Sequence, residues 1–367
     1  MTNHRTPLLA FLALMLLVAA CGESDEAATP TPDRGDRPAA ALLTPTAGPE
    51  PIAFPNDEAP HDVLTEWWYY TGHMMTEDGT RYGFEFVFFQ SQRGEFPTGY
   101  ASHFAITDSA NDRFLYDQRI GTDANQNPEE GFHLRLDDWE MSGANGQDHL
   151  VASLDDISME LSLTDTKGPA LHDDIGYFDM GEAGGSYYYS RTRMEIDGSL
   201  TIDGEEVPVQ GDAWMDHQWG DFVVPGVGGW DWFAFQLDSG DDLMVFVIRD
   251  ENDDVVLTFG SLVDPEGSVE SIGAEEIAIT ETDTWTSEES GATYPSAWTI
   301  DVDTLDLSLN VRPTMADQEL DTRATTGVIY WEGEVEIDGI FRGESIGGLG
   351  YVELTGYASD PSFTPGS

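Results

Sequence analysis

The sequence predicts an all-β protein with two tandem β-barrel or β-sandwich domains. Apolar and polar residues alternate in many short runs, which is the pattern of half-buried strands. Asp-Gly and Ser-Gly pairs follow several of these runs, and no segment after residue 21 has the periodicity of a helix. An aromatic pair, a turn and an apolar strand occur at Trp67/Trp68 and again at Trp230/Trp232, which indicates related domains at residues 54–222 and 223–360.

Residues 1–21 are expected to be a lipoprotein signal peptide. Residues 8–17 form an apolar run that is too short to span a membrane as a stable helix. Val18-Ala19-Ala20-Cys21 resembles a bacterial lipobox, and Cys21 is the only cysteine of the chain. We expect Cys21 to carry the lipid; the alternative is an ordinary signal peptide with an incidental cysteine. A lipid anchor predicts a location in the cell envelope, on the outer face of the cytoplasmic membrane or in the periplasm.

Residues 22–53 are expected to be a disordered tether. They are rich in alanine, proline, threonine and acidic residues, and they contain no aromatic residue. A tether of this kind would hold a folded body away from a membrane surface. With one cysteine in the whole chain no internal disulfide is possible, so hydrophobic cores must stabilise the folded part.

The net charge excludes one class of partner. Acidic residues outnumber basic ones by 70 to 15, for a formal net charge of −55. Phosphate would be repelled, so we expect no nucleic-acid partner. The acidic groups also repel one another, and salt screens that repulsion, which predicts greater stability at high salt.

The folded part begins with a predicted hairpin. Residues 66–73 form an aromatic strand, Asp78-Gly79 is the turn signal, and residues 82–90 return as the second strand. Glu85 shares one face of this second strand with Val87 and Phe89. We therefore expect Glu85 to be buried with a hydrogen-bonding partner, and Glu66, which opens the first strand, to be a similar case.

Further strands are predicted along the rest of the chain. Turn signals at Asp197-Gly198, Asp203-Gly204 and Ser239-Gly240 predict hairpins between some of them. The predicted strands lie at residues 157–163, 186–194, 207–209, 230–237, 243–248, 305–311 and 335–337.

A stretch near the middle, residues 211–220, carries the strongest candidate chemistry. It contains two tryptophans, two aspartates and a histidine between flanking glycines. In a strand, Asp216 would lie beside Trp214, and His217 beside Trp219. A carboxylate or imidazole against an indole ring is partly desolvated, so its pKa moves and acid–base chemistry becomes possible. The alternative is a structural connection between two β-units, with buried tryptophans and a hydrogen-bonded aspartate.

These segments resemble one known family when they are taken together. Glu66-Trp67-Trp68-Tyr69-Tyr70-Thr71-Gly72, Trp214-Met215-Asp216-His217-Gln218-Trp219-Gly220 and Gly350-Tyr351-Val352-Glu353-Leu354-Thr355-Gly356 are similar to signatures of the carotenoid 1,2-hydratase (hydroxyneurosporene synthase) family and its AttH-like secreted relatives. The resemblance implies two lipocalin-like domains. It also implies that His217 and Trp219 occupy the His-x-Trp pair that matters for activity in the hydratases. The hydratases carry a Tyr-x-Asp pair further on, and the corresponding positions here hold Phe246 and Ile248.

Three functions remain open from the sequence. The first is an enzyme that hydrates or isomerises a hydrophobic, isoprenoid-like substrate by acid–base catalysis. The second is a lipoprotein that binds an apolar ligand without chemistry, and the third is a hydrolase, although no Gly-x-Ser-x-Gly or His-Glu-x-x-His motif is present. We expect no cofactor and no metal, because His217 has no histidine or cysteine near it in the sequence.

Two sets of candidate site residues follow from these hypotheses. The catalytic candidates are Asp216, His217 and Trp219. The candidates for substrate binding are Glu66, Trp67, Tyr69, Glu85, Trp214, Trp230, Trp232, Tyr330 and Glu332.

Overall fold

The computed structural model describes residues 48–179, 184–221 and 227–358. These residues form strands that are joined by turns and short 3-10 turns, so the predicted all-β class is confirmed. Within the described ranges, no helix has the length and apolar character needed to cross a membrane. The lipobox, most of the predicted tether and Cys21 lie outside the described residues.

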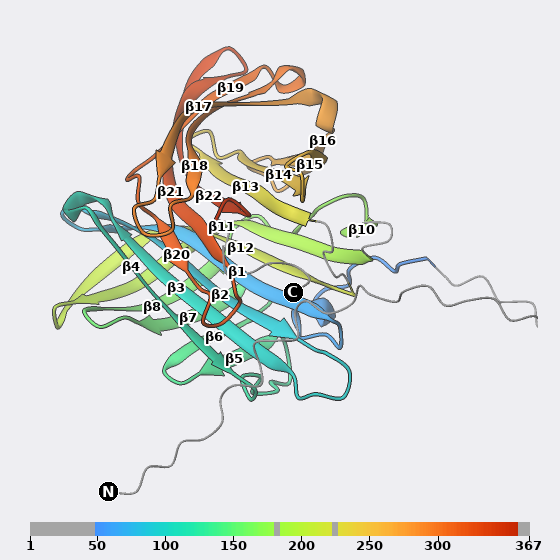
Figure 1. The fold of residues 1–367 in the computed structure, drawn as a ribbon, viewed down its shortest axis with the longest axis vertical. Helices are drawn as coiled ribbons and strands as arrows, with labels where there is room; N and C mark the ends of the chain where they lie inside the picture. Colours follow the sequence, from blue (N-terminus) through green and yellow to red (C-terminus); the bar gives the residue numbers. More distant parts are fainter. Residues whose placement is uncertain (1–47, 180–183, 222–226, 359–367) are drawn as a thin grey trace, which may run out of the picture. The chain divides into compact units, whose positions relative to one another are not determined.

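The first β-sheet has 12 strands, shown from blue to green in Figure 1. Its main path runs β4-β3-β2-β1-β12-β11-β8-β7-β6-β5, and β9 and β10 pair with β11. The strands are β1 (Thr65–Thr76), β2 (Arg81–Ser91), β3 (Gly99–Asp108), β4 (Arg113–Gly121), β5 (Phe132–Leu136), β6 (Trp139–Ala144), β7 (Gln147–Ser153), β8 (Ile157–Asp165), β9 (Ala170–Leu171), β10 (Tyr177–Asp179), β11 (Gly185–Ile202) and β12 (Glu205–Gly220).

The second β-sheet has 10 strands, shown from yellow to red. Its path runs β16-β15-β14-β13-β22-β21-β19-β18-β17, and β20 pairs with β21. The strands are β13 (Val227–Leu237), β14 (Asp242–Asp250), β15 (Val255–Val263), β16 (Val269–Ile272), β17 (Ile277–Thr286), β18 (Thr293–Val302), β19 (Leu307–Pro313), β20 (Glu319–Asp321), β21 (Ile329–Phe341) and β22 (Glu344–Thr355).

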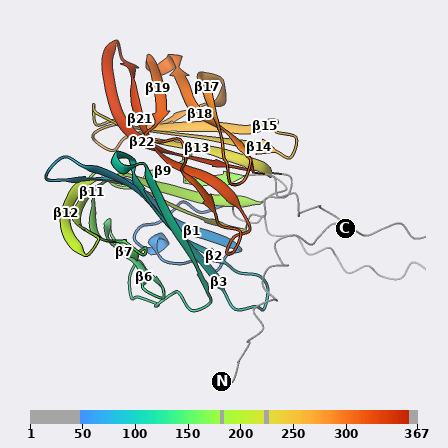
Figure 2. The ribbon, with the colours of Figure 1, turned by 60° about the vertical axis from the view of Figure 1, so that its left-hand side comes forward.

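The first sheet curls until its two end strands approach each other. A Cβ atom placed on Gly121 at the end of β4 would lie 2.7 Å from Leu136 of β5, so the two ends are in contact there. The guanidinium of Arg119 on β4 lies 4.3 Å from the ring centre of Trp139 on β6. Figure 2 shows β1, β2 and β3 side by side along this sheet. The nearly closed sheet encloses a core of aromatic and aliphatic side chains, among them Trp68, Phe86 and Trp139.

Both sheets use the same strand order around their first strand. In the first sheet β1 lies between β2 and β12, and in the second sheet β13 lies between β14 and β22. The first and last strands of each unit therefore pair with each other, antiparallel in both cases. The repeat of an aromatic strand, a turn and an apolar strand in the sequence thus corresponds to a structural repeat.

A third apolar cluster packs the outer face of the first sheet against the second sheet. Tyr69 of β1 and Trp214 of β12 contact Trp232 of β13, with ring centres 5.3 Å and 6.0 Å apart. Large aromatic side chains bury roughly 150–250 Å² each. The apolar surface that this cluster buries therefore stabilises the packing of the two sheets against each other. We call it the layer between the sheets.

Most predicted turns are confirmed, and one is wrong. Gly79, Gly204 and Gly240 have positive φ angles of 86°, 83° and 88° and lie in hairpin turns. Gly198, in contrast, lies inside β11 and pairs with Leu161 of β8. A Cβ atom on Gly198 would lie 2.3 Å from a backbone oxygen of β8, so glycine is needed there for the close approach of two strands.

Candidate functional site

The central stretch forms the end of β12, and its side chains point to two opposite faces. His217 and Trp219 lie in the core of the first sheet, with ring centres 4.6 Å apart. Asp216 and Trp214 lie on the other face, where the Trp214 Nε1 donates to Asp216 Oδ1 at 2.7 Å. The predicted neighbours are therefore correct, but the three catalytic candidates do not meet in one site.

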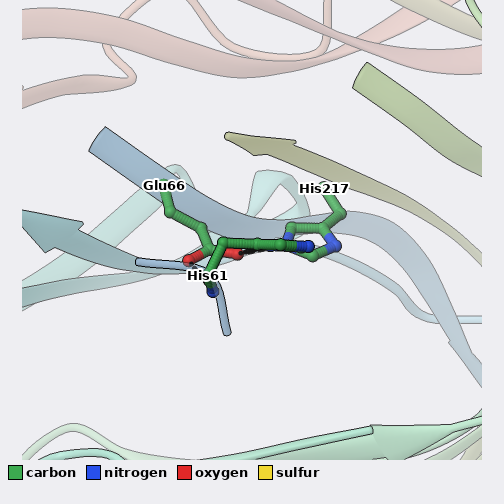
Figure 3. A group of neighbouring side chains, drawn as sticks. All are labelled: His61, Glu66 and His217. Atoms are coloured by element: carbon green, nitrogen blue, oxygen red, sulfur yellow. Dashed lines mark hydrogen bonds and ion pairs between the residues drawn. The ribbon is translucent and has the colours of Figure 1, made fainter. Parts of the chain in front are cut away.

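On the inner face, His217 belongs to a group of three side chains that we call the inner site: His61, Glu66 and His217 (Figure 3). Glu66 Oε1 lies 2.8 Å from His217 Nε2 and 2.8 Å from His61 Nδ1. His217 has no histidine near it in the sequence, but the segment before β1 brings His61 beside it in the structure. Nothing in the local sequence marks this contact.

Burial and hydrogen bonding set the protonation of the inner site. Burial alone would raise the pKa of Glu66, but hydrogen bonds to His217 and His61 outweigh it, so the pKa is lowered. Burial lowers the pKa of His217, and the nearby Glu66 carboxylate only partly opposes this shift. The ring of His217 stacks on Trp68 and that of His61 on Trp219, at 4.7 Å and 4.2 Å between centres.

On the outer face, the Asp216 carboxylate accepts three hydrogen bonds. Tyr188 Oη donates to its Oδ2 at 2.6 Å, and Trp214 and Ser190 both donate to its Oδ1. Burial raises the pKa of Asp216 to about 6, against the effect of these hydrogen bonds. Trp232 of the second sheet donates to Tyr188 Oη at 3.1 Å, so this network joins the two sheets.

Three carboxyl groups gather nearby in the layer between the sheets: Glu85 of β2, Glu332 of β21 and Glu353 of β22. We call them the acid layer. Glu85 and Glu332 are at most 1 % exposed, and Glu353 is half-buried. Tyr69 Oη donates to Glu332 Oε1 at 2.6 Å, and Trp230 Nε1 donates to Glu353 Oε2 at 2.9 Å.

The remaining contacts of the acid layer are few. Tyr330 Oη lies 3.5 Å from Glu85 Oε1 and 2.8 Å from His103 Nδ1. The Oε2 atoms of Glu85 and Glu332 are buried and have no hydrogen-bond partner among the described residues. No arginine or lysine forms an ion pair with the three acids within the described part of the chain.

An acid layer without cations favours protonated carboxyl groups. Burial, followed by the charge of Glu353, raises the pKa values of Glu85 and Glu332 well above the ordinary range. Burial also raises the pKa of Glu353 to about 7, and the charges of Asp216 and Asp231 add to this effect. All three carboxyl groups of the acid layer are therefore shifted toward the neutral form.

The predicted substrate-binding residues divide in the same way as the catalytic ones. Glu66 lies in the inner site, and all the others lie in the layer between the sheets or at its edge. The sequence-based reasoning missed His61, His103, Tyr188 and Glu353 as site residues. Glu353 lies within one of the motifs that carry the resemblance, but only the pairing of β22 with β21 and β13 places it beside Glu332 and Trp232.

Two surface hollows lie elsewhere among the described residues. One is small and acidic and is lined by Asp301, Asp303 and Asp306. The other, of about 470 Å³, lies over β5 to β8 and reaches Phe132 and Asp148. Neither is lined by the acid layer or by the inner site.

Several solved structures are similar to this chain, and they include the following three. A Nitrosomonas europaea protein provisionally classed as AttH is 31% identical, with a TM-score of 0.76, over 86% of this chain and 100% of that chain. Kievitone hydratase from Nectria haematococca has a TM-score of 0.68 at 16% identity, over 84% of this chain and 94% of that chain. CghA, in a complex with Sch210972, has a TM-score of 0.52 at 14% identity, over 80% and 88%.

The last two structures share the fold with this chain, which confirms the lipocalin-like architecture of the two sheets. Among curated proteins, none matches the sequence significantly. The family model for AttH-like proteins matches residues 45–357. The chain therefore belongs to the AttH-like family.

Proposed function

We propose that this protein is a hydratase-type enzyme that protonates and then hydrates a carbon–carbon double bond of an apolar, isoprenoid-like substrate at the acid layer. The observation that carries the proposal is the unpartnered Oε2 of Glu332. Tyr69 donates its own proton to Oε1, so the proton of a neutral Glu332 belongs on Oε2. A buried carboxyl group with a free O–H is a suitable proton donor to carbon.

The chemistry follows from the positions of these groups. Glu332 gives its proton to one alkene carbon, the π electrons form the new C–H bond, and the other carbon becomes a cation. The indole faces of Trp230 and Trp232 would stabilise this cation by about 0.5–2 kcal/mol each. Water adds to the cation, and its surplus proton passes to the Glu353 carboxylate. Glu353 lies directly opposite Glu332 on the β-ladder, so it returns the proton and restores the starting state.

The strand pairing supports a role for Glu353 beside Glu332. Phe246, at the position corresponding to the tyrosine of the hydratase pair, lies opposite Trp232, and Trp232 lies opposite Glu353. Directly opposite residues share one face of a sheet. A carboxyl group from β22 thus occupies the face on which the hydratases would use residues of β14. The name of kievitone hydratase, which shares the fold, agrees with a hydratase-type reaction.

A binding protein is the second candidate function, because the same layer is rich in aromatic side chains and could hold an apolar ligand without chemistry. A hydrolase is less favoured. His172 lies between Ser190 and Ser261, at 2.7 Å and 3.1 Å, but Asp216 bonds Ser190 rather than the histidine. In a hydrolase triad the acid bonds the histidine and orients it toward the serine, so this arrangement is not a triad.

The test uses isoprenoid alkenes of increasing length as probes in D₂O, with products analysed by mass spectrometry and binding measured by tryptophan quenching. The wild type should form a product that contains added D₂O. Glu332→Gln should lower the rate about 10²–10⁴-fold with little change in affinity. Glu344→Gln, at an exposed position of β22, should match the wild type. Binding without any mass gain in the wild type would refute the enzyme and favour the binding protein.

We also propose that lipid attached to Cys21 anchors the enzyme in the cell envelope, on the outer face of the cytoplasmic membrane or in the periplasm. The support is the sequence Val18-Ala19-Ala20-Cys21 and the polar segment after it. An anchored enzyme would meet an apolar substrate at the membrane, where such molecules are concentrated.

A further inference from the structure

We infer that the inner site binds one divalent transition-metal ion of the zinc class through His61 Nδ1, Glu66 Oε1 and His217 Nε2. These three atoms lie within 4.8 Å of one another. Two imidazole nitrogens and a carboxylate oxygen are the donor set that such ions prefer. An ion with ligand bonds of about 2.0–2.2 Å fits among them once the two histidine–Glu66 contacts, now 2.8 Å, lengthen slightly.

The carboxylate is held in the way a metal ligand is held. Glu66 Oε2 accepts the backbone N–H of His61 at 2.8 Å and the side-chain amide of Gln90 at 3.0 Å. Tyr100 Oη in turn donates to Gln90 Oε1 at 2.9 Å. One oxygen is thus fixed by donors, and only Oε1 points at both histidines, as in a ligand that binds through a single oxygen.

Each histidine also has an outer partner for its second nitrogen. His217 Nδ1 lies 3.3 Å from Tyr189 Oη, and His61 Nε2 lies 3.7 Å from Asp57 Oδ1. Contacts of this kind select the tautomer that leaves the other nitrogen free to bind a metal. The stacked rings of Trp68 and Trp219 fix the planes of the two imidazoles.

The ligands come from two separate parts of the fold. Glu66 and His217 lie on the adjacent strands β1 and β12, whereas His61 lies in the segment that precedes β1. An ion at the inner site would therefore link the segment that contains His61 to strands β1 and β12 of the first sheet. Three protein ligands would leave further coordination positions for water or a small anionic ligand. The site lies on the opposite face of β1 from Tyr69, so it is separate from the acid layer.

The experiment treats the folded protein with a chelator, removes the chelator and titrates with Co²⁺, which is followed by its visible absorption, or with Zn²⁺, which is followed by calorimetry. Excess Ca²⁺ is present throughout, because 70 acidic residues bind hard cations weakly at the surface. We expect one equivalent of Co²⁺ to bind with a tetrahedral or five-coordinate spectrum. Zn²⁺ should also raise the melting temperature of the wild type.

The key variant is His61→Gln, because the His61 side chain is 21% exposed and its replacement leaves the core intact. It should weaken Co²⁺ binding more than about 100-fold and abolish the Zn²⁺-induced stabilisation. His133→Gln is the matched control, since His133 forms an ordinary pair with Glu140 at 2.9 Å, with both side chains about a third exposed. Binding that stays unchanged in His61→Gln, or no stoichiometric binding by the wild type, would overturn the inference.

Discussion

Glu332 and Glu353 face each other directly across the ladder between β21 and β22. Two ionised carboxylates at such a position would repel each other. Burial and this repulsion both favour the neutral form of the two groups, which gives the acid layer its chemical character.

The first prediction concerns the pH dependence of stability. The folded pKa of Glu353 is raised to about 7, so the carboxyl group contributes stability that is complete below its unfolded pKa and is lost as pH rises through 7. In the Glu353→Gln variant this side chain is neutral at every pH, so its contribution to stability does not fall as pH rises. Between pH 5 and pH 8.5, the free energy of unfolding should fall in both proteins. The fall should be on the order of 2 kcal/mol smaller in the variant than in the wild type.

Urea unfolding at a series of pH values measures this difference. The general repulsion among the acidic residues also grows with pH, so only the difference between variants is informative. Glu344→Gln on the same strand controls for the loss of one negative charge. Parallel pH curves for Glu353→Gln and the wild type would mean that Glu353 is ionised throughout.

The second prediction concerns Asp216, which accepts hydrogen bonds from Tyr188, Trp214 and Ser190. Asp216→Asn would turn a nitrogen with its own hydrogens toward these donors, so we expect a loss of about 2–4 kcal/mol of stability. Glu206→Gln, at an exposed position of β12, should cost less than about 0.5 kcal/mol. Urea unfolding would measure both, and wild-type stability for Asp216→Asn would contradict the network.

The third prediction compares the two tryptophans of the central stretch. Both are buried, and each change to alanine should cost about 3–5 kcal/mol through the cavity it leaves. Trp214→Ala should cost more than Trp219→Ala, because it also removes a donor from buried Asp216. Denaturant unfolding of both variants tests the order, and a larger loss for Trp219→Ala would show that ring packing dominates.

The fourth prediction follows from the formal net charge of −55. Molar salt should raise the melting temperature above its low-salt value, since screening weakens repulsion among exposed carboxylates. Thermal unfolding in a series of NaCl concentrations measures the effect. A flat or falling curve would show that ion pairs such as Arg312–Asp338 matter more than the overall repulsion.

The fifth prediction concerns anchoring. Cys21→Ser should release the protein from the membrane fraction and abolish labelling by a radioactive fatty acid. Both losses should occur without a change in the melting temperature, because the two sheets are built from residues 65–355. Retention of the serine variant on membranes, with acyl labelling intact, would rule out the lipobox.

Local pattern alone predicted nine of the strands and which of their residues share a face, but it did not predict β3 to β7 or β15 to β18. Alternation in residues 82–90 correctly placed Glu85 on one face with Val87 and Phe89, because the side-chain period of a strand is two. The same rule paired Asp216 with Trp214 and His217 with Trp219. It failed at Gly198, since a glycine in a turn and a glycine at a close approach of strands look alike in sequence.

Tertiary structure decided which of these faces became sites. The outer face of β12 carries Asp216, and the inner face carries His217, but only the pairing of β1 with β12 brings Glu66 to the histidine, and only the preceding segment brings His61. The acid layer likewise depends on packing between sheets, because Glu85 and Glu332 are separated by more than two hundred residues. Burial raises the pKa values of these carboxyl groups, and burial depends on which surfaces the folded chain covers.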